Sequence, residues 1–148
     1  MQNLAQHVQR EKAIKALYQM DFHLEKSGNQ ATREVVAAFL DNYDDVDTLS
    51  VPNYLTTLVD GVLASRYELE NLIADSLQPG WSLRRLQKID LYIMEVALFE
   101  MLYEQETIPP LGAISEALEI ADSYSDEKSK KFINGVLSKI YKEKFEAA

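Results

Sequence analysis

The chain of 148 residues contains no cysteine, so it can form neither a disulfide bond nor a thiolate metal site. Its five glycines are scattered and provide neither a P-loop nor a dinucleotide-binding fingerprint. Its two histidines, His7 and His23, form no metal-binding pair at helical spacing. No apolar run approaches the roughly 20 residues that span a bilayer, and no signal peptide is visible. These absences argue against an enzyme and predict a cytoplasmic binding protein without a metal or cofactor.

The composition nevertheless supports a folded core. Hydrophobic residues make up 47% of the chain and charged residues 26%, which is typical of a globular protein. A chain of this length suits one domain, or two very small ones that share a core.

Charge is distributed unevenly along the sequence. The formal net charge is -9, but residues 1–20 carry +2, residues 128–148 carry +4, and the segment between them carries −15. If the two ends meet in space, they form a basic patch that favours phosphate, because contact forces decay over a Debye length of about 10 Å. The acidic body would attract a basic protein. Alternatively, the lysine-rich end is only a solvated helix face.

Apolar residues recur at helical spacing along most of the chain, and no alternating strand pattern bounded by hairpin signals occurs. We therefore predict an all-α fold of about seven helices. The helix-breaking pair Pro79-Gly80 divides it into two packed subdomains, 1–79 and 80–148, of a single domain. The clearest helices are expected around residues 13–24, 35–40, 55–77, 89–102, 114–121 and 132–141.

Residues 10–18 combine cations with an aromatic ring on one expected helix. Lys12 and Lys15 lie three residues apart and share a face, Arg10 lies nearer the N-terminus, and Tyr18 could stack on a base. The alternative is an ordinary amphipathic helix whose lysines lie in water.

Two further residues are unusual among the helical apolar repeats of the second half of the chain. Trp81, the only tryptophan, follows the helix breaker, and we expect it to be buried by packing between the two halves. Asp90 is the lone acid at the start of an apolar helix. It is either stabilised by the helix dipole or faces a cation of a partner.

Residues 125–137 combine clustered lysines with a glycine in a helical run. Lys128, Lys130 and Lys131 at the helix start oppose its dipole, and Gly135 costs about 1 kcal/mol relative to alanine. Such costs without a structural need suggest a phosphate ligand. The alternative is that the helix begins later and these lysines belong to a loop.

Several of these segments together carry a family resemblance along essentially the whole chain. Two blocks are specific, Ile114–Ala121 (Ile-Ser-Glu-Ala-Leu-Glu-Ile-Ala) and Phe132–Leu137 (Phe-Ile-Asn-Gly-Val-Leu). In this order and spacing the chain resembles the bacterial transcription antitermination factor family NusB. The other matching residues are Arg10, Ala13, Ala16-Leu17-Tyr18, Gly80-Trp81, Asp90, Ala97-Leu98-Phe99-Glu100 and Ile108-Pro109.

The resemblance implies an all-helical fold of two three-helix-based subdomains without a catalytic residue. It also implies binding to the boxA element of nascent ribosomal RNA leaders, together with a small-subunit ribosomal protein. That complex joins the elongating RNA polymerase and suppresses termination. Members of the family occur as monomers and dimers, so a homodimer is possible, and no membrane is involved.

Residue by residue, the resemblance and the charge pattern predict two surfaces. Asp90 is expected to face the protein partner. The RNA-binding residues are expected to be Arg10, Lys12, Tyr18, Lys130, Lys131 and Phe132, which requires the opening and closing helices to be neighbours.

This chain departs from the family pattern at two places. Gln6–Gln9 stands where members often have an arginine-rich run, which removes counterion release from phosphate contacts. Glu95 stands where members often have arginine.

Two other functions fit parts of the sequence. The strong acidity favours an acidic protein–protein adaptor or chaperone in ribosomal RNA processing or ribosome assembly, with little RNA contact of its own. Domains of this family also occur fused to RNA methyltransferases, but the chain is too short for an added cofactor domain.

Overall fold

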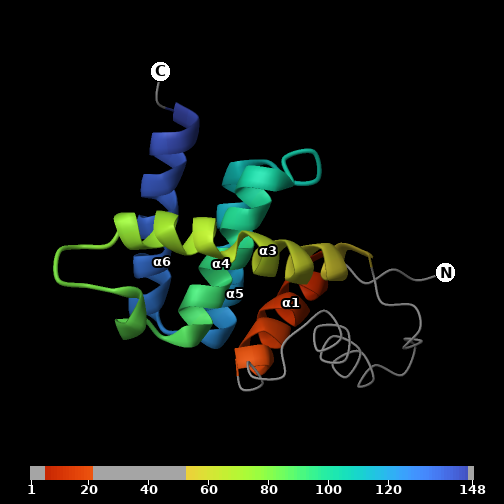
Figure 1. The fold of residues 1–148 in the computed structure, drawn as a ribbon, viewed down its shortest axis with the longest axis horizontal. Helices are drawn as coiled ribbons and strands as arrows, with labels where there is room; N and C mark the ends of the chain where they lie inside the picture. Colours follow the sequence, from red (N-terminus) through yellow and green to blue (C-terminus); the bar gives the residue numbers. More distant parts are fainter. Residues whose placement is uncertain (1–5, 22–52, 147–148) are drawn as a thin grey trace. The chain divides into compact units, whose positions relative to one another are not determined.

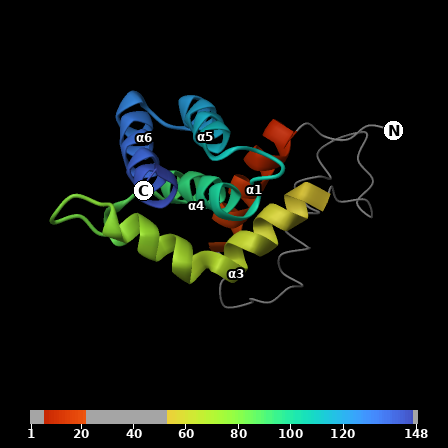
Figure 2. The same cartoon turned by 90° about the horizontal axis from the view of Figure 1, so that it is seen from above.

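The computed structural model describes residues 6–21 and 53–146, and every regular element in these two ranges is helical (Figures 1 and 2). They contain five α-helices, a 3-10 helix and a short π-helix. The all-α prediction is confirmed, with five α-helices in the described ranges against the expected total of about seven. The helix expected around residues 35–40 lies outside the described residues. The chain divides into two compact units, residues 1–63 and 64–148, with the boundary inside one long helix.

In the first unit, helix α1 (Gln6–Asp21) is joined to the beginning of helix α3 (Asn53–Asp75). The side-chain Oε1 of Gln9 accepts a hydrogen bond of 2.9 Å from the backbone N–H of Leu55. That N–H belongs to the first turn of α3, where amides have no partner within the helix, so Gln9 caps α3 from another element. The buried apolar residues of this unit are Ala13, Ile14, Ala16, Leu17, Leu55, Leu58, Val59 and Val62.

The second unit begins with the last turns of α3 and a tight turn. Gly80 has a φ of 89°, a left-handed conformation that glycine adopts without steric cost. The 3-10 helix η2 (Leu83–Arg85) follows. Ser82 occupies its N-cap position as expected, but its side chain makes no capping hydrogen bond.

Helix α4 (Lys88–Tyr103) lies at the centre of the second unit. Its residues 90–101 are all buried, which is the arrangement predicted for a helix without a polar face. It contacts both α5 (Pro110–Tyr124) and α6 (Glu127–Tyr141), which also contact each other (Figure 2). The prolines at 109 and 110 separate α4 from α5 as predicted, with Pro110 in the first turn of α5.

Helix α6 begins directly after its N-cap residue, Asp126. The Asp126 carboxylate accepts a hydrogen bond of 2.8 Å from the backbone N–H of Ser129. This bond, the largest cause, lowers the pKa of Asp126. Because α6 starts at Glu127, the alternative that Lys128, Lys130 and Lys131 belong to a loop is wrong. The π-helix η3 (Lys142–Glu146) extends α6 and stacks Phe145 on Tyr141.

Two polar interactions tie α3 to α4 within the second unit. Arg66 Nη2 donates to Oε1 of Glu95 at 3.2 Å, and Tyr103 donates from its hydroxyl to the carboxylate of Glu68. The bond to Glu68 raises the pKa of Tyr103. Glu95 is fully buried (0% exposed), so the acid noted in the sequence lies inside the contact between α3 and α4, against the guanidinium of Arg66.

Burial, as the largest cause, raises the pKa of Glu95 to about 8. The neighbouring carboxylate of Glu70 raises it further, while the Arg66 guanidinium lowers it. Oε2 of Glu95 is buried without a hydrogen-bond partner, and a proton on this atom can be shared with Glu70. The carboxyl group is therefore largely protonated near neutral pH.

Candidate nucleic-acid interface

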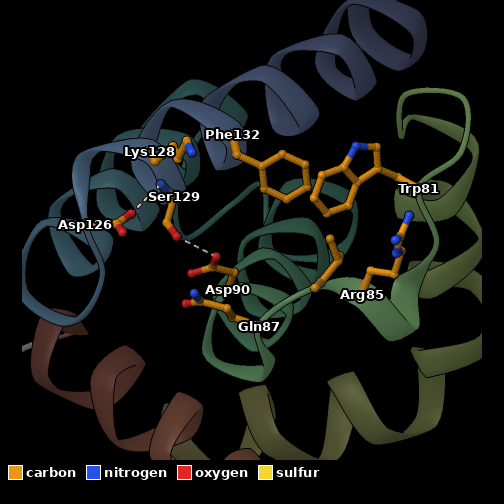
Figure 3. Close-up of a pocket in the computed structure, with 9 residues that line it drawn as sticks. Trp81, Arg85, Gln87, Asp90, Asp126, Lys128, Ser129 and Phe132 are labelled. Carbon is orange, nitrogen blue, oxygen red and sulfur yellow. Dashed lines mark hydrogen bonds between the residues drawn. The ribbon is translucent and has the colours of Figure 1, made fainter.

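A half-open pocket of about 310 Å³ lies in the second unit, between the turn after α3, the start of α4 and the start of α6 (Figure 3). Its lining combines two large aromatic rings with basic and acidic side chains. The lining residues are Trp81, Arg85, Leu86, Gln87, Asp90, Asp126, Lys128, Ser129 and Phe132.

The aromatic wall of the pocket is formed by Trp81 and Phe132, which face each other in Figure 3. Their ring centroids are 6.3 Å apart, and their planes are tilted by 36°. Trp81 is 52% exposed, so the expectation that packing would bury it is wrong. Because about half of its surface is exposed, the indole can be stacked on by a ligand.

Arg85 supports the exposed side of the indole. Its guanidinium carbon lies 5.8 Å from the centroid of the Trp81 ring, within the range of a cation–π interaction. Arg85 Nη1 also donates to the backbone carbonyl of Gly80 at 3.0 Å. The left-handed turn at Gly80 and the guanidinium together hold the indole at the rim of the pocket.

Asp90 forms the base of the pocket and joins three elements. Its Oδ1 accepts a hydrogen bond from the Ser125 hydroxyl and its Oδ2 one from the Ser129 hydroxyl, each at 2.8 Å. The residue is 4% exposed and lies in the first turn of α4. The helix dipole therefore favours this carboxylate, as one of the two sequence interpretations proposed. Asp90 fixes the beginning of α6 against the beginning of α4.

Of the predicted RNA-binding residues of α6, Phe132 lines this pocket, whereas Lys130 and Lys131 do not. Phe132 is partly buried in its wall, and Lys131 is exposed. Lys130 Nζ is 3.3 Å from Oδ1 of Asp122 on α5, so its charge is partly neutralised. Lys128 is exposed at the pocket rim.

The predicted RNA-binding residues of α1 lie in the first unit. Tyr18 is 40% exposed, whereas Arg10 is 3% and Lys12 8% exposed. Arg10 donates to Oε1 of Gln6 at 3.3 Å, and its guanidinium lies 5.9 Å from the centroid of the Tyr54 ring. The two sets therefore belong to different units, and the adjacency of the opening and closing helices stays a prediction.

Sequence reasoning named Lys128 in the lysine cluster that suggests a phosphate ligand, but it included neither Lys128 nor Arg85 among the RNA-binding residues. It expected Trp81 to be buried by packing, although a lone tryptophan directly after the helix-breaking Pro79-Gly80 pair is a signal. Arg85 had no distinctive signal, since its role depends on a guanidinium lying over a ring.

Residues 6–21 and 53–146 contain no group of three or more histidine, aspartate or glutamate side chains that could hold a metal ion. In the same part of the chain, no helix is long and apolar enough to span a membrane.

Comparison with known proteins relates the whole described chain to one family. The model of the NusB family matches residues 7–142. A transcription antitermination protein NusB from Enterococcus faecalis is 40% identical over 146 residues, which cover 95% of this chain and 91% of that protein. Another from Lactiplantibacillus plantarum is 36% identical over 140 residues, which cover 95% and 96%.

Solved structures show the same similarity. NusB from T. maritima aligns with a TM-score of 0.79 and 30% identity, covering 99% of this chain and 100% of that one. A crystal structure of the antitermination factors NusB and NusE in complex with double-stranded RNA contains a chain that aligns with a TM-score of 0.71 and 26% identity. That alignment covers 95% of this chain and 99% of the other.

Proposed function

The chain belongs to the NusB family, and from this premise we propose that it is an RNA-binding transcription antitermination factor. With a small-subunit ribosomal protein it would bind the boxA element of ribosomal RNA leader transcripts and help RNA polymerase to read through terminators. It would act in the cytoplasm as a single NusB-like domain with subdomains 1–79 and 80–148, and without catalysing a reaction. Support comes from its relatives and from the solved NusB–NusE complex with RNA.

The pocket in the second unit is the observation that carries the RNA part of the proposal. Single-stranded RNA is commonly held by base stacking on aromatic rings and by cations along its backbone. Trp81 and Phe132 supply rings, and Arg85 and Lys128 supply cations at the same rim. A base unstacked from its neighbours could lie against the indole while its phosphates contact the lysine.

The two sets of predicted residues have different parts in this proposal. Phe132 and Lys131 would extend the contact from the pocket, and Lys130, which pairs with Asp122, would contribute less. Arg10 and Lys12 of α1 are 3% and 8% exposed, so they would act mainly by supporting exposed residues of α1. Tyr18 would supply a further ring.

The protein partner is favoured by an acidic segment. Residues 89–127 contain ten acidic residues and no lysine or arginine. Asp90, Glu95 and Glu100 are buried, and the other seven favour a basic partner through faster association and discrimination against acidic proteins. Asp90 would contribute to partner binding by fixing the α4–α6 junction, since both of its carboxylate oxygens already accept hydrogen bonds from serines.

The single tryptophan provides a direct test. A boxA-like single-stranded RNA is titrated into the protein while Trp81 fluorescence and RNA anisotropy are recorded. We expect the fluorescence to change with the same midpoint as the anisotropy, and the ribosomal protein to shift both midpoints to lower concentration. Fluorescence that stays constant while the RNA binds would show that the pocket is not the site.

Alanine variants separate the pocket from general aromatic contacts. Phe132→Ala should weaken RNA binding by about fivefold to 150-fold, since stacking contributes about 1–3 kcal/mol per base. Tyr67→Ala is the matched control, because Tyr67 is an aromatic residue of α3 that is 84% exposed and lies outside the pocket. If RNA binding is absent but the ribosomal protein still binds tightly, the chain is instead an acidic adaptor.

A further inference from the structure

Helix α6 carries a row of lysines along one face. At 100° per residue, Lys128, Lys131, Lys139 and Lys142 fall within an arc of roughly 80°, and all four are exposed. We call these four residues the lysine row. It spans 14 positions, or about 21 Å at 1.5 Å per residue, from the rim of the pocket to the beginning of η3.

The lysine row is not neutralised within the second unit. Among the residues that the structure describes, none of its four members forms a salt bridge, whereas Lys130 on another face of α6 pairs with Asp122. Lys128 interacts electrostatically with the capping carboxylate of Asp126. Glu127, Glu143 and Glu146 lie four residues from Lys131, Lys139 and Lys142, but none of these pairs forms a salt bridge in the described residues. Lys128 and Lys131 also lie in the first two turns, where the helix dipole disfavours cations. An anionic ligand would offset this cost.

Gly135 lies in the middle of the lysine row, and the structure gives no internal reason for a glycine there. A Cβ atom added to Gly135 would meet nothing within 4 Å. Its φ is not in the left-handed region, because Gly80 is the only described glycine with positive φ. Glycine is unfavourable in a helix interior compared with alanine. What it provides at this position is open access to the backbone of α6 between the lysines.

The lysine row is continuous with the aromatic wall. Phe132 lies one helical turn from both Lys128 and Gly135, and its ring faces Trp81 (Figure 3). A single-stranded RNA with one base stacked on these rings would therefore place the phosphates of its next nucleotides along the exposed face of α6.

We propose that α6 is a phosphate track for single-stranded RNA that flanks the element bound in the pocket, with the closest approach at Gly135. This inference rests on the proposed function and extends its site by the length of a helix. The occupant is RNA because the track combines cations, an open backbone and an adjoining stacking surface.

The first experiment compares two RNAs, a boxA-like core and the same core with unstructured flanks on both sides. Lys139→Gln should leave the affinity for the core unchanged and weaken the flanked RNA about fivefold at 0.1 M salt, since each phosphate contact contributes about 0.7 to the salt slope. The slope itself should fall by about 0.7. Lys144→Gln is the matched control, because it removes the same charge from the opposite face.

The second experiment uses opposite effects on stability and binding. Gly135→Ala should raise the Tm, because alanine favours the helix, and yet weaken binding of the flanked RNA about threefold to tenfold. Asn134→Ala, on the neighbouring face, should leave that binding unchanged. The track would be overturned if Gly135→Ala raised the Tm but left the affinity for the flanked RNA unchanged. It would also be overturned if Lys139→Gln and Lys144→Gln had equal effects on that affinity.

The outcomes separate the track from the proposed function. If wild-type protein binds neither RNA, both fail. If it binds the core but gains nothing from the flanks, only the track fails. If the flanked RNA alone binds, and Lys139→Gln weakens it, the track stands while specific recognition of the core fails.

Discussion

Two of the three buried acids of helix α4, Asp90 and Glu95, lie five residues apart in different surroundings. Asp90 accepts hydrogen bonds from two neutral hydroxyl groups at the base of the pocket. Glu95 pairs with a guanidinium between α3 and α4, and its pKa is about 8. Because both donors are neutral hydroxyl groups, the position of the Asp90 carboxylate is fixed by hydrogen-bond geometry and not by an opposite charge. Asp90 can therefore set the shape of a binding site. The contact between Arg66 and Glu95 instead links two helices in a way that depends on the protonation of Glu95.

The largest expected effect comes from replacing Glu95 with arginine. Glu95→Arg places two guanidinium groups together in a buried site, and we expect a loss of about 4 kcal/mol or more in unfolding free energy. Urea denaturation followed by circular dichroism measures it. The double variant Arg66→Glu/Glu95→Arg should recover at least half of this loss. No recovery would show that the ion pair is not what the site requires.

The second effect is a pH dependence that Glu95 alone should cause. Between about pH 4.5 and 8, the folded protein keeps a proton on Glu95 that the unfolded chain releases. Stability therefore falls as pH rises through this window, by on the order of 4 kcal/mol for this group. Glu95→Gln should remove that contribution, because its amide can accept from Arg66 and donate to Glu70 without titrating.

The measurement is the difference in unfolding free energy between wild type and Glu95→Gln at pH 5 and at pH 8, taken from urea denaturation. The variant should be the more stable protein, relative to wild type, at the higher pH. A difference that does not vary with pH would mean that Glu95 is not protonated in the folded state.

Asp90 should give a smaller loss of stability but a larger loss of function. Asp90→Ala leaves two serine hydroxyls without their acceptor, which we expect to cost about 2–3 kcal/mol. RNA binding at a temperature where the variant stays folded should weaken more than in Glu95→Gln, because the α4–α6 junction shapes the pocket. Trp81 fluorescence and RNA anisotropy report both effects. Asp90→Asn, which retains one acceptor, should be intermediate.

The smallest effect should come from removing one of the two serine donors. Ser125→Ala removes a partly exposed hydroxyl and should cost about 1 kcal/mol, since Ser129 still holds the other carboxylate oxygen. Thermal unfolding is sufficient to detect it. An effect as large as that of Asp90→Ala would mean that the two bonds act only together.

The sequence was informative where local patterns decide structure. The nearly all-apolar stretch 89–102 predicted the central helix, the two prolines predicted the separation of α4 from α5, and the last helix was placed correctly. Gly135 and the lysine cluster were recognised as unusual because they opposed helix propensity or the helix dipole. These signals are local, so a single sequence can reveal them.

Long-range pairings could not be predicted from the sequence. Arg66 and Glu95 are 29 positions apart, and nothing near either residue identifies its partner. Gln9 was interpreted only as a missing cation, whereas its side chain caps α3 across 46 positions. Trp81 was expected to be buried because tryptophan usually is, but a turn and a guanidinium keep it at the surface.

The burial of every residue from 90 to 101 of α4 has a consequence for how this protein can vary. None of these positions faces solvent, so a substitution at any of them changes the packing inside the protein. Adaptation to a new RNA or partner should therefore accumulate on α5, α6 and the loops, while α4 changes only through coordinated replacements, as the pair of Arg66 and Glu95 illustrates.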